Sequence, residues 1–552
     1  MKGKNTLQPS AVPENKPFRY SVYFIIFGAT AVSGAYFAPW MIILNIFFLL
    51  LLIFRKTAIK LDLNAAFLTG LLIAAVLSSV IVGGSPGIAV EELLKYLLFP
   101  VSYIVFLNIE DKKMVEAVFY HSFIFLAVGG LMAMAGLPLI SDMVIEESGR
   151  LQSFIQYANT TAMLLSVGVL MSVNYFIVLK KKIHIIYGAV MLAALILTQS
   201  RIGILVFVAV TALYVFTRIK QKRKYYIAAA LGAAAVGAAV VGHRIVMNFI
   251  FEPTLVERYI TYLDAISELR SNFFGIGMGM WQFEHVQFQS APYQVKYIHS
   301  VYFQIAMDCG VLGLLCFLAA AIKAAIAGIK EKGIYLFMLL LLAAGSIFEV
   351  NFAFGIVIIF FTFVLSNLSP KLKEFNVRKA ALLPLTTPIL ALTILLFSEA
   401  AVFLGRQSSG NPERAMGAYN VALHLNPLNY RIYMDMAKLE TSPHKSLELL
   451  ELGFSKNPVD RHFMAELVEG YKFVGDRART LEYARLLYKQ YRYRIETEQS
   501  YEAALQDAYE AGLISREDFH FELTLFHAEV RDARGAMNPL YRYIRPHIES
   551  RN

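Results

Sequence analysis

The chain has 552 residues, of which 57% are hydrophobic and only 17% are charged, and its mean hydropathy is +0.53. A soluble protein of this length cannot bury so much apolar surface, so the composition excludes an ordinary water-soluble protein and indicates one that uses lipid as a solvent. The net charge of +10 does not indicate nucleic acid, because Lys and Arg lie in short clusters between apolar runs, as topology signals do. No nucleic-acid partner is expected.

About thirteen apolar segments are predicted to cross the membrane as helices, because their lengths are close to the ~20 residues that span the hydrocarbon core. They lie near residues 20–37, 39–54, 65–84, 91–109, 114–136, 158–178, 183–199, 202–217, 225–242, 301–322, 334–350, 354–368 and 381–404. Strand-like alternation is absent, so we expect an all-α polytopic transmembrane bundle of about 12–13 helices. The lower count applies if the first two segments, which are split by Ala38-Pro39, form one broken helix; every later assignment is then inverted.

Basic residues are concentrated in alternate loops, which the positive-inside rule assigns to the cytoplasm together with residues 1–19. These loops contain Arg55, Lys56 and Lys60; Lys112 and Lys113; Lys180, Lys181 and Lys182; Lys220, Lys222, Arg223 and Lys224; Lys323, Lys330 and Lys332; and Lys371, Lys373, Arg378 and Lys379. With an odd helix count, residues 20–404 form the transmembrane domain, and the outer loop 243–300 and residues 405–552 are extracytoplasmic. The polar start shows no cleavable signal peptide, so the first helix is expected to act as an uncleaved anchor.

Beyond Gly405 the sequence becomes charged and amphipathic, with apolar residues at helical spacing and no further spanning run. The segment Asn411-Pro412-Glu413-Arg414-Ala415, followed by Tyr419, Ala422 and Asn426-Pro427, resembles a tetratricopeptide helix pair. Asn457-Pro458 follows about 31 residues later, close to that repeat's usual ~34. We therefore predict a helical-repeat domain over residues 405–552, which either binds a protein partner on a concave surface or packs as a cap on the membrane domain.

The outer loop 243–300 is longer than ordinary connections, which is typical of functional or disordered segments. Its apolar residues fit one face of an amphipathic helix from about residue 254 to 271, so we expect order. The next residues, Phe274-Gly275-Ile276-Gly277-Met278-Gly279-Met280-Trp281, contain alternating glycines that permit a tight turn and close approach of the backbone to a ligand. Because no strand precedes them, they are not a dinucleotide fingerprint.

His299-Ser300 closes this loop, directly before Val301-Tyr302-Phe303-Gln304 and then Gly310-Val311-Leu312-Gly313-Leu314-Leu315. This pattern resembles the signature of the O-antigen ligase and polymerase family, which includes bacterial protein O-oligosaccharyltransferases. Ser300 stands where the family commonly has asparagine. Two further segments agree in order and sidedness. Thr198-Gln199-Ser200-Arg201 resembles the family's Ser-Arg motif, and Gly149-Arg150 with Tyr157-Ala158-Asn159-Thr160-Thr161-Ala162 resembles its earlier outer-loop motif.

The resemblance covers roughly residues 20–400 and implies a multi-pass enzyme of the bacterial cytoplasmic (inner) membrane. It implies transfer of a glycan from an undecaprenyl-diphosphate carrier to an acceptor on the outer face of that membrane, namely a lipid, a cell-wall polymer, a protein hydroxyl or another glycan. It also implies that His299, at the matching position, is the general base. No cofactor is expected, and the other histidines show no spacing with carboxylates that indicates a metal site.

The chemistry of such a transfer can be compared with the residues. A lipid diphosphate leaving group needs cations that stay charged and grip phosphate oxygens in a fork, and Arg201 and Arg258 fit that requirement. The acceptor hydroxyl needs a group that takes its proton near neutral pH, and His299 fits. In a competing assignment His299 binds phosphate and a carboxylate is the base. The candidates for that base are Glu257, Asp264 and Glu268.

Arg150 and Lys95 are further candidates for diphosphate binding. Lys95 lies about one turn inside an outer helix end, where an ion pair with Glu91 or Glu92 explains it equally well. Glu349, at another outer helix end, has the same ambiguity between a structural and a functional role.

Three other functions remain possible on the sequence. A polymerase that joins lipid-linked repeat units would need the same donor site and would differ only in its acceptor groove. A glycan-lipid flippase or polysaccharide exporter would be expected to show internal repeats and charged residues near the midplane of several helices, and neither is clear. Alternatively, the membrane part is an anchor and residues 405–552 recruit a partner.

Overall fold

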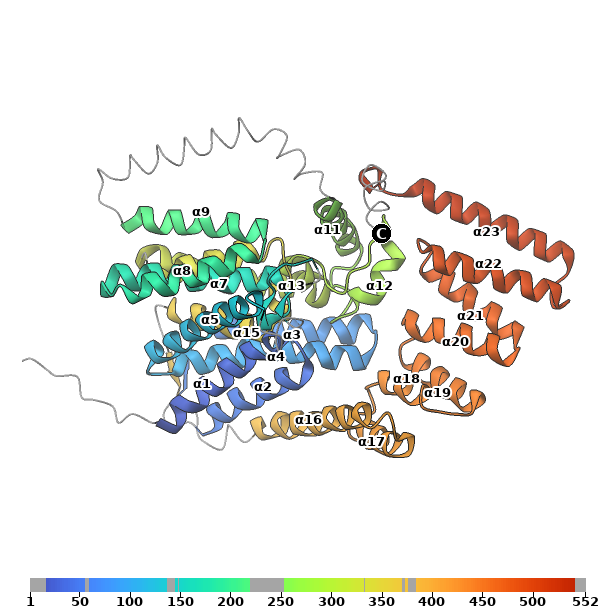
Figure 1. The fold of residues 1–552 in the computed structure, drawn as a ribbon, viewed down its shortest axis with the longest axis horizontal. Helices are drawn as coiled ribbons and strands as arrows, with labels where there is room; N and C mark the ends of the chain where they lie inside the picture. The colour runs from blue at the N-terminus through green and yellow to red at the C-terminus, as the bar shows by residue number, and fades with distance from the viewer. Residues whose placement is uncertain are drawn as a thin grey trace, which may run out of the picture.

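The computed structural model describes residues 16–54, 59–136, 144–146, 148–218, 253–331, 333–369, 373–375 and 384–541. Within these ranges the chain is helical almost throughout, as predicted (Figure 1). The predicted span 225–242 lies outside the described residues. One small feature was not predicted: β1 (Ile59–Leu61) pairs with β2 (Lys373–Phe375) in an antiparallel ribbon. Strands of three residues are too short to show an alternating pattern in the sequence.

Every predicted span that falls within the described residues forms a helix. These are α1 (Lys16–Ala31), α2 (Ala38–Ile53), α3 (Leu63–Val82), α4 (Pro86–Asn108), α5 (Lys112–Met134), α7 (Ala158–Leu179), α8 (Ile183–Leu197), α9 (Arg201–Arg218), α13 (Val301–Glu331), α14 (Ile334–Gly345), α15 (Gly355–Asn367) and α16 (Thr386–Gln407). Among the described helices, α3, α5, α7, α9, α13 and α16 are long and apolar enough to cross a membrane. Shorter apolar helices accompany them, which fits a multi-pass membrane protein.

The first two apolar segments are separate helices. Between α1 and α2, the short helix η1 (Ser33–Ala35) has positive φ at Ser33, Gly34 and Ala35, with values of 48°, 62° and 57°. Left-handed backbone at three successive residues cannot continue a right-handed helix. The structure therefore shows two separate helices here and not one broken helix.

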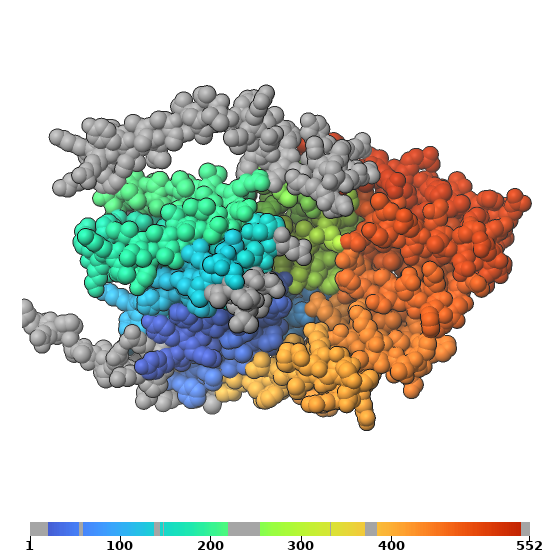
Figure 2. Space-filling view, viewed as in Figure 1, coloured from blue at the N-terminus to red at the C-terminus, as the bar shows by residue number. Residues whose placement is uncertain are grey.

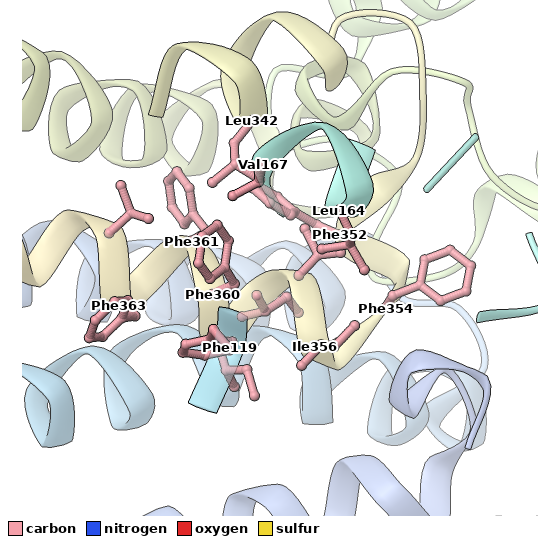
Figure 3. Packing of buried hydrophobic residues seen from close by; sticks show 14 of the residues in the cluster. Phe119, Leu164, Val167, Leu342, Phe352, Phe354, Ile356, Phe360, Phe361 and Phe363 are labelled. Carbon is pink, nitrogen blue, oxygen red and sulfur yellow. The ribbon is translucent and has the colours of Figure 1, made fainter. Parts of the chain in front are cut away.

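Helix α15 lies at the centre of the bundle, where every residue from Gly355 to Ser366 is buried. Its Phe360 ring packs on Phe119 of α5, with ring centroids 5.0 Å apart. Figure 3 shows further apolar side chains of α7 and α14 around the same helix. A helix that is apolar on all sides is stable only inside such a core. Because residues 346–354 lead directly into α15, the core also fixes the position of that connection, which carries Glu349.

The outer loop contains α11 (Pro253–Ser271), close to the predicted helix, and α12 (Trp281–Phe288). Between them, the loop backbone bonds to a break in α13, where Gly310 has φ 69° and ψ −178°. The Ile276 N–H donates to the Met307 carbonyl (2.7 Å), and the Val311 N–H donates to the Phe273 carbonyl (3.0 Å). These bonds satisfy backbone groups that the break would leave unpaired in apolar surroundings. The alternating glycines thus allow the loop backbone to lie close to the backbone of α13.

Gly275 is the tightest point of this contact. It has φ +79°, and a Cβ there would lie 2.3 Å from the Met307 carbonyl oxygen. We expect Gly275→Ala to lower the thermal midpoint strongly, because a left-handed alanine costs roughly 1–2 kcal/mol and the backbone clash adds to it. Gly136→Ala is the matched control, since Gly136 has φ +87° and nothing within 4 Å of a built Cβ. Equal losses in a fluorescence melt of the two variants would contradict this account.

The C-terminal region is a series of helices that each pack against the next. They are α17 (Pro412–Leu425), α18 (Arg431–Ala437), α19 (Pro443–Lys456), α20 (Arg461–Val474), α21 (Arg477–Gln490), α22 (Ile495–Glu510) and α23 (Arg516–Ala536). The series curves from the end of α16 towards α12, and Figure 2 shows it lying against the outer loop. The tetratricopeptide resemblance of these helices stays a prediction.

Contacts at both ends of this series attach it to the rest of the chain. Near its start, the Arg431 guanidinium donates to both carboxylate oxygens of Glu91 on α4, at 3.0 and 2.9 Å. Near its end, the Asn538 N–H donates to the Ser290 carbonyl of the outer loop at 2.8 Å. The C-terminal helices therefore bridge the membrane domain and the outer loop.

Candidate active site

A single carboxylate, Glu349, connects two of the side chains that the sequence singled out, Arg258 and His299. It follows α14, is 6% exposed, and receives contacts on both oxygens. Its Oε1 accepts hydrogen bonds from Arg258 Nη1 (2.7 Å) and Asn159 Nδ2 (2.7 Å). Its Oε2 accepts a hydrogen bond from the Tyr157 hydroxyl (2.7 Å) and lies 3.5 Å from His299 Nδ1. The structure thus brings two of the outer motifs and Arg258 of α11 together around one acidic residue.

The charge of Glu349 is compensated within this cluster. Burial by itself would raise the pKa of Glu349, but His299 and Arg258 oppose burial more strongly and hold that pKa below its usual value. The carboxyl group is therefore ionised at neutral pH. An ionised carboxylate beside an imidazole orients the ring and stabilises the imidazolium that forms when the ring takes a proton.

His299 is held in place by its backbone. Its carbonyl accepts a hydrogen bond from the Tyr262 hydroxyl of α11, and the next residue but one, Val301, donates its N–H to the Ser346 carbonyl (3.0 Å). The imidazole remains partly accessible, with 27% of the side chain exposed. The outer helix α11 and the connection after α14 therefore fix the backbone while the ring can still meet a substrate.

A cavity of about 470 Å³ opens beside His299. This volume is within the range of small-molecule sites. Aromatic side chains dominate its wall, with amides and one cation among them. The lining includes Tyr36, Phe37, Tyr157, Tyr297, Phe354, Gln156, Gln294, Lys296 and His299. A wall of aromatic faces with a few polar groups suits a ligand that is partly apolar and partly hydrogen-bonding, as a sugar is.

Two left-handed turns meet at this cavity. Ser33 (φ 48°) and Gln156 (φ 59°) both line it, and the Ser33 hydroxyl donates to Gln156 Oε1 at 3.0 Å. Positive φ at such residues is costly and persists only where surrounding contacts impose it, and such positions cluster at functional sites. The strained turns thus add an independent reason to regard this cavity as a site.

Arg150 joins the cluster indirectly, through Asn159. Its Nη2 donates to Asn159 Oδ1 (2.8 Å), and its Nε donates to the Thr198 carbonyl (3.1 Å). The same guanidinium lies 3.5 Å from Glu146. Arg201 is exposed at the first residue of α9, three residues after Thr198, and is not among the cavity-lining residues. Arg150 and Arg201, which were both predicted to bind phosphate, therefore lie near the same turn. Neither of them lines the cavity.

Lys95 forms the ion pair that the sequence offered as its structural alternative. The buried ammonium lies 2.6 Å from Glu92 Oε2 and 2.7 Å from the Tyr297 hydroxyl, which also donates to Glu92 Oε1 (2.8 Å). Tyr297 in turn lines the cavity beside His299. The position of Lys95 therefore supports the cavity wall through Tyr297.

The three candidate carboxylate bases occupy different places along α11. Glu257 is close enough to His299 for their charges to interact, and burial raises its pKa. Asp264 is buried and accepts hydrogen bonds from the Ser290 N–H (2.8 Å) and the Tyr293 hydroxyl (2.9 Å), so it fastens the outer loop. Glu268 accepts from Asn272 (2.5 Å) near the far end of the helix, about 15 Å along the axis from Arg258. Only Glu257 adjoins the cluster.

Glu284 of α12 is an acidic residue that the sequence did not single out. Burial, and secondarily the charge of Glu268, raise the pKa of Glu284 to about 7. The folded state therefore holds the Glu284 proton more tightly than the unfolded chain, in which this carboxyl titrates near 4.5. The stability that this proton contributes is fully present below pH 4.5 and is lost as pH rises through 7. We expect Glu284→Gln to raise the melting midpoint at pH 8 and to leave it unchanged at pH 4.5.

The control for this measurement is Glu466→Gln, which changes an exposed glutamate of the C-terminal helices. A Glu284→Gln variant that gains equally at both pH values, or gains nothing at pH 8, would contradict the assignment of the raised pKa.

Sequence reasoning missed three residues of the site. Tyr157 and Asn159 fall within the motif that the resemblance identified, but nothing in the motif shows that they bond to Glu349. Lys296 lines the cavity, and its ammonium donates to the Tyr36 hydroxyl (3.0 Å) and lies over the Tyr36 and Tyr297 rings. The available signal was a lysine in the outer loop three residues before His299, against the positive-inside trend.

Comparison with known protein families finds a match in the part of the chain that contains several of the candidate site residues. Residues 186–318 match the family model Wzy_C, described as O-antigen ligase. The matched segment contains Arg201, Arg258 and His299, whereas Arg150 and Glu349 lie outside it. A search of curated proteins found no match to the chain. Residues 186–318 are thus similar to the O-antigen ligase family, and this similarity suggests a glycosyltransferase-like membrane enzyme that transfers or polymerises lipid-linked glycans.

Proposed function

We propose that this protein transfers a glycan from an undecaprenyl-diphosphate carrier to an acceptor hydroxyl on the outer face of the bacterial cytoplasmic membrane, as an O-antigen ligase does. The acceptor is a lipid, a cell-wall polymer or a protein. The observation that carries this proposal is the position of His299, which lies within the matched segment, on the wall of a cavity, and 3.5 Å from the ionised Glu349. In this proposal, residues 405–552 and the outer loop lie outside the membrane.

His299 would act as the general base. With Nδ1 towards Glu349, the other ring nitrogen, Nε2, is left to accept the proton. The acceptor O–H bond breaks as its proton moves to Nε2, and the acceptor oxygen forms a bond to the anomeric carbon of the donor glycan. The bond from that carbon to the diphosphate oxygen breaks, and undecaprenyl diphosphate leaves. Glu349 stabilises the imidazolium that results.

Arg258 would bind the leaving diphosphate. Within the part of the chain that the structure describes, its polar contacts to Glu349 and to the Phe348 carbonyl both use Nη1, which leaves the donors of Nε and Nη2 for phosphate oxygens. Arg201, and Arg150 behind it, would add positive charge at the edge of the site. Because these guanidinium groups supply the charge that stabilises the leaving group, the proposed reaction needs no metal ion. Lys95 would act on the site through its contact with Tyr297.

Glu257 is the alternative base, because it adjoins His299 and burial raises its pKa towards neutrality. In that case His299 would bind phosphate. Substitution separates the two assignments: Glu257→Gln would leave most of the activity if His299 is the base and remove it if Glu257 is.

The proposal is tested by reconstituting the full chain with undecaprenyl-diphosphate glycan and an acceptor-containing membrane extract, with and without EDTA. We expect the glycan to appear on the acceptor in both conditions, in a single addition for each acceptor site. Extended ladders on the lipid carrier would instead identify a polymerase. Loss of transfer in EDTA that is restored by a divalent cation would contradict the metal-independent mechanism.

A further inference from the structure

A second cavity, of about 380 Å³, lies between the outer loop and the C-terminal helices. The loop contributes Gln289, Tyr293 and Gln294, and the C-terminal helices contribute Tyr491, Tyr493 and Arg494. Its position is fixed by hydrogen bonds that cross the boundary, including Arg461 Nη1 to Gln294 Oε1 (2.9 Å) and the Asn538 N–H to the Ser290 carbonyl (2.8 Å). The cavity therefore depends on both parts of the chain.

This cavity adjoins the one beside His299. Gln294 lines both of them, so the two cavities share a wall residue. A flexible chain of linked sugars that is held in the first cavity would extend past Gln294 into the second. Because the two cavities are adjacent, one glycan can occupy both of them.

One polar atom in the wall lacks a partner among the described residues. Gln289 is only 5% exposed, and its Oε1 accepts no hydrogen bond within the described part of the chain. A buried amide oxygen left unpaired costs roughly 1–3 kcal/mol, which a ligand hydroxyl in the cavity would recover. The oxygen itself exposes less than 1 Å² to solvent, so the side chain must rotate towards the cavity before it accepts a hydrogen bond from a bound molecule.

Arg494 gives the cavity a positive charge. Among the described residues its guanidinium forms no ion pair, and it lies near a second cation, Arg461. Burial, and then that neighbour, lower the pKa of Arg494, which means that its charge is poorly solvated. Two carboxylates share the wall, but Glu498 is paired with Arg534 (2.5 Å) and Glu496 offsets Arg494 only in part. A bound anion would therefore be stabilised here.

We infer that the cavity between the outer loop and the C-terminal helices is a saccharide-binding site, which holds sugars of the transferred glycan that lie beyond the reacting bond and include an acidic sugar. Tyr493, the least buried tyrosine of the wall, offers a flat apolar face for a sugar ring, Gln289 accepts from a hydroxyl, and Arg494 pairs with a carboxylate or phosphate. Because the inference concerns the substrate of the neighbouring cavity, it rests on the proposed function. It also gives the C-terminal helices a role in substrate selection.

The test measures binding and does not depend on catalysis. The probe is the oligosaccharide released by mild acid from the cell's own lipid-linked glycan, titrated into the full-length protein in lipid nanodiscs and followed by calorimetry. We expect saturable binding by the wild type and by His299→Ala. Arg494→Ala and Gln289→Leu should each raise the Kd at least tenfold, whereas the control Arg516→Ala, at an exposed arginine outside the cavity, should not change it.

Gln289→Leu separates a binding role from a structural one. Replacing an unpartnered buried amide by an apolar side chain of similar size should preserve or raise the melting midpoint, so weaker binding in a stable variant points to a direct contact. Carboxyl reduction of the probe should abolish the difference between wild type and Arg494→Ala. Unchanged Kd in both cavity variants, or no binding by a wild type that still transfers glycan, would overturn the inference while leaving the proposed function intact. Binding without any transfer would retain the site and remove the proposed function.

Discussion

Replacement of His299 by alanine is expected to lower kcat for glycan transfer by roughly 10²- to 10⁴-fold, the contribution usual for a positioned general base. The donor KM should change little, because the imidazole acts on the acceptor hydroxyl. The reason lies in the geometry: Glu349 is 3.5 Å from Nδ1, the ring lines the cavity, and the backbone on both sides is fixed by hydrogen bonds. Initial rates at saturating donor and acceptor provide the measurement.

The variant must be shown to fold, and a melting curve with size-exclusion chromatography does so. His444→Ala, which changes an exposed histidine of the C-terminal helices, is the matched control and should retain wild-type rates. Full activity in a folded His299→Ala protein would remove His299 from the chemistry. A large rise in donor KM with unchanged kcat would instead make it a phosphate-binding residue and favour Glu257 as the base.

Glu349→Gln is expected to lower kcat by roughly 10- to 10³-fold, although the residue makes no contact with the bond that reacts. The amide keeps the shape of the carboxylate, and with its single oxygen in the place of Oε1 it can still accept from Arg258 and Asn159, but the NH2 group that then faces Tyr157 and His299 cannot stabilise an imidazolium. Donor KM should be unchanged or lower, because the charge of Arg258 is no longer neutralised within the protein. Glu349→Ala would be a poorer test, since it empties a buried position that four side chains contact.

A double variant distinguishes positioning from simple structural support. If Glu349 acts through His299, the Glu349→Gln substitution should have little further effect on kcat in a His299→Ala background. Multiplicative losses in the double variant would show that Glu349 acts separately, for example by maintaining the fold of the connection after α14. Tyr157→Phe, which removes only the hydroxyl bond to Oε2, should cost far less than Glu349→Gln in either background.

The transmembrane architecture followed from local sequence features. Runs of apolar residues near the length of a membrane crossing identified the helices, and the amphipathic helix predicted over 254–271 is found as α11 (Pro253–Ser271). The pairing of β1 with β2 was beyond such reasoning, because it joins residues far apart in the chain. The break at Gly310 was also hidden, since a helical pattern continues on either side of it and the loop that repairs the break lies elsewhere in the sequence.

Several residues of the candidate site could be predicted from the sequence, but the contacts that connect them could not. His299 and Arg150 were identified from motifs and Arg258 from the chemistry of the leaving group, but their link through Glu349 and Asn159 depends on how separate helices pack. Asp264 has contacts that the sequence did not predict. An acidic residue in a functional loop resembles a base in the sequence, and only its two hydrogen bonds reveal that it fastens Ser290 and Tyr293. Charge and spacing therefore identify candidates, and packing decides their roles.

The most direct test of the central claim is the release of undecaprenyl diphosphate by the purified full chain from authentic lipid-linked glycan. We predict one free undecaprenyl diphosphate for each glycan transferred, release that requires acceptor, and loss of both products together in a folded His299→Ala variant. Failure of the folded wild type to release the carrier from its authentic donor in the presence of acceptor would contradict the account, as would equal release by the variant.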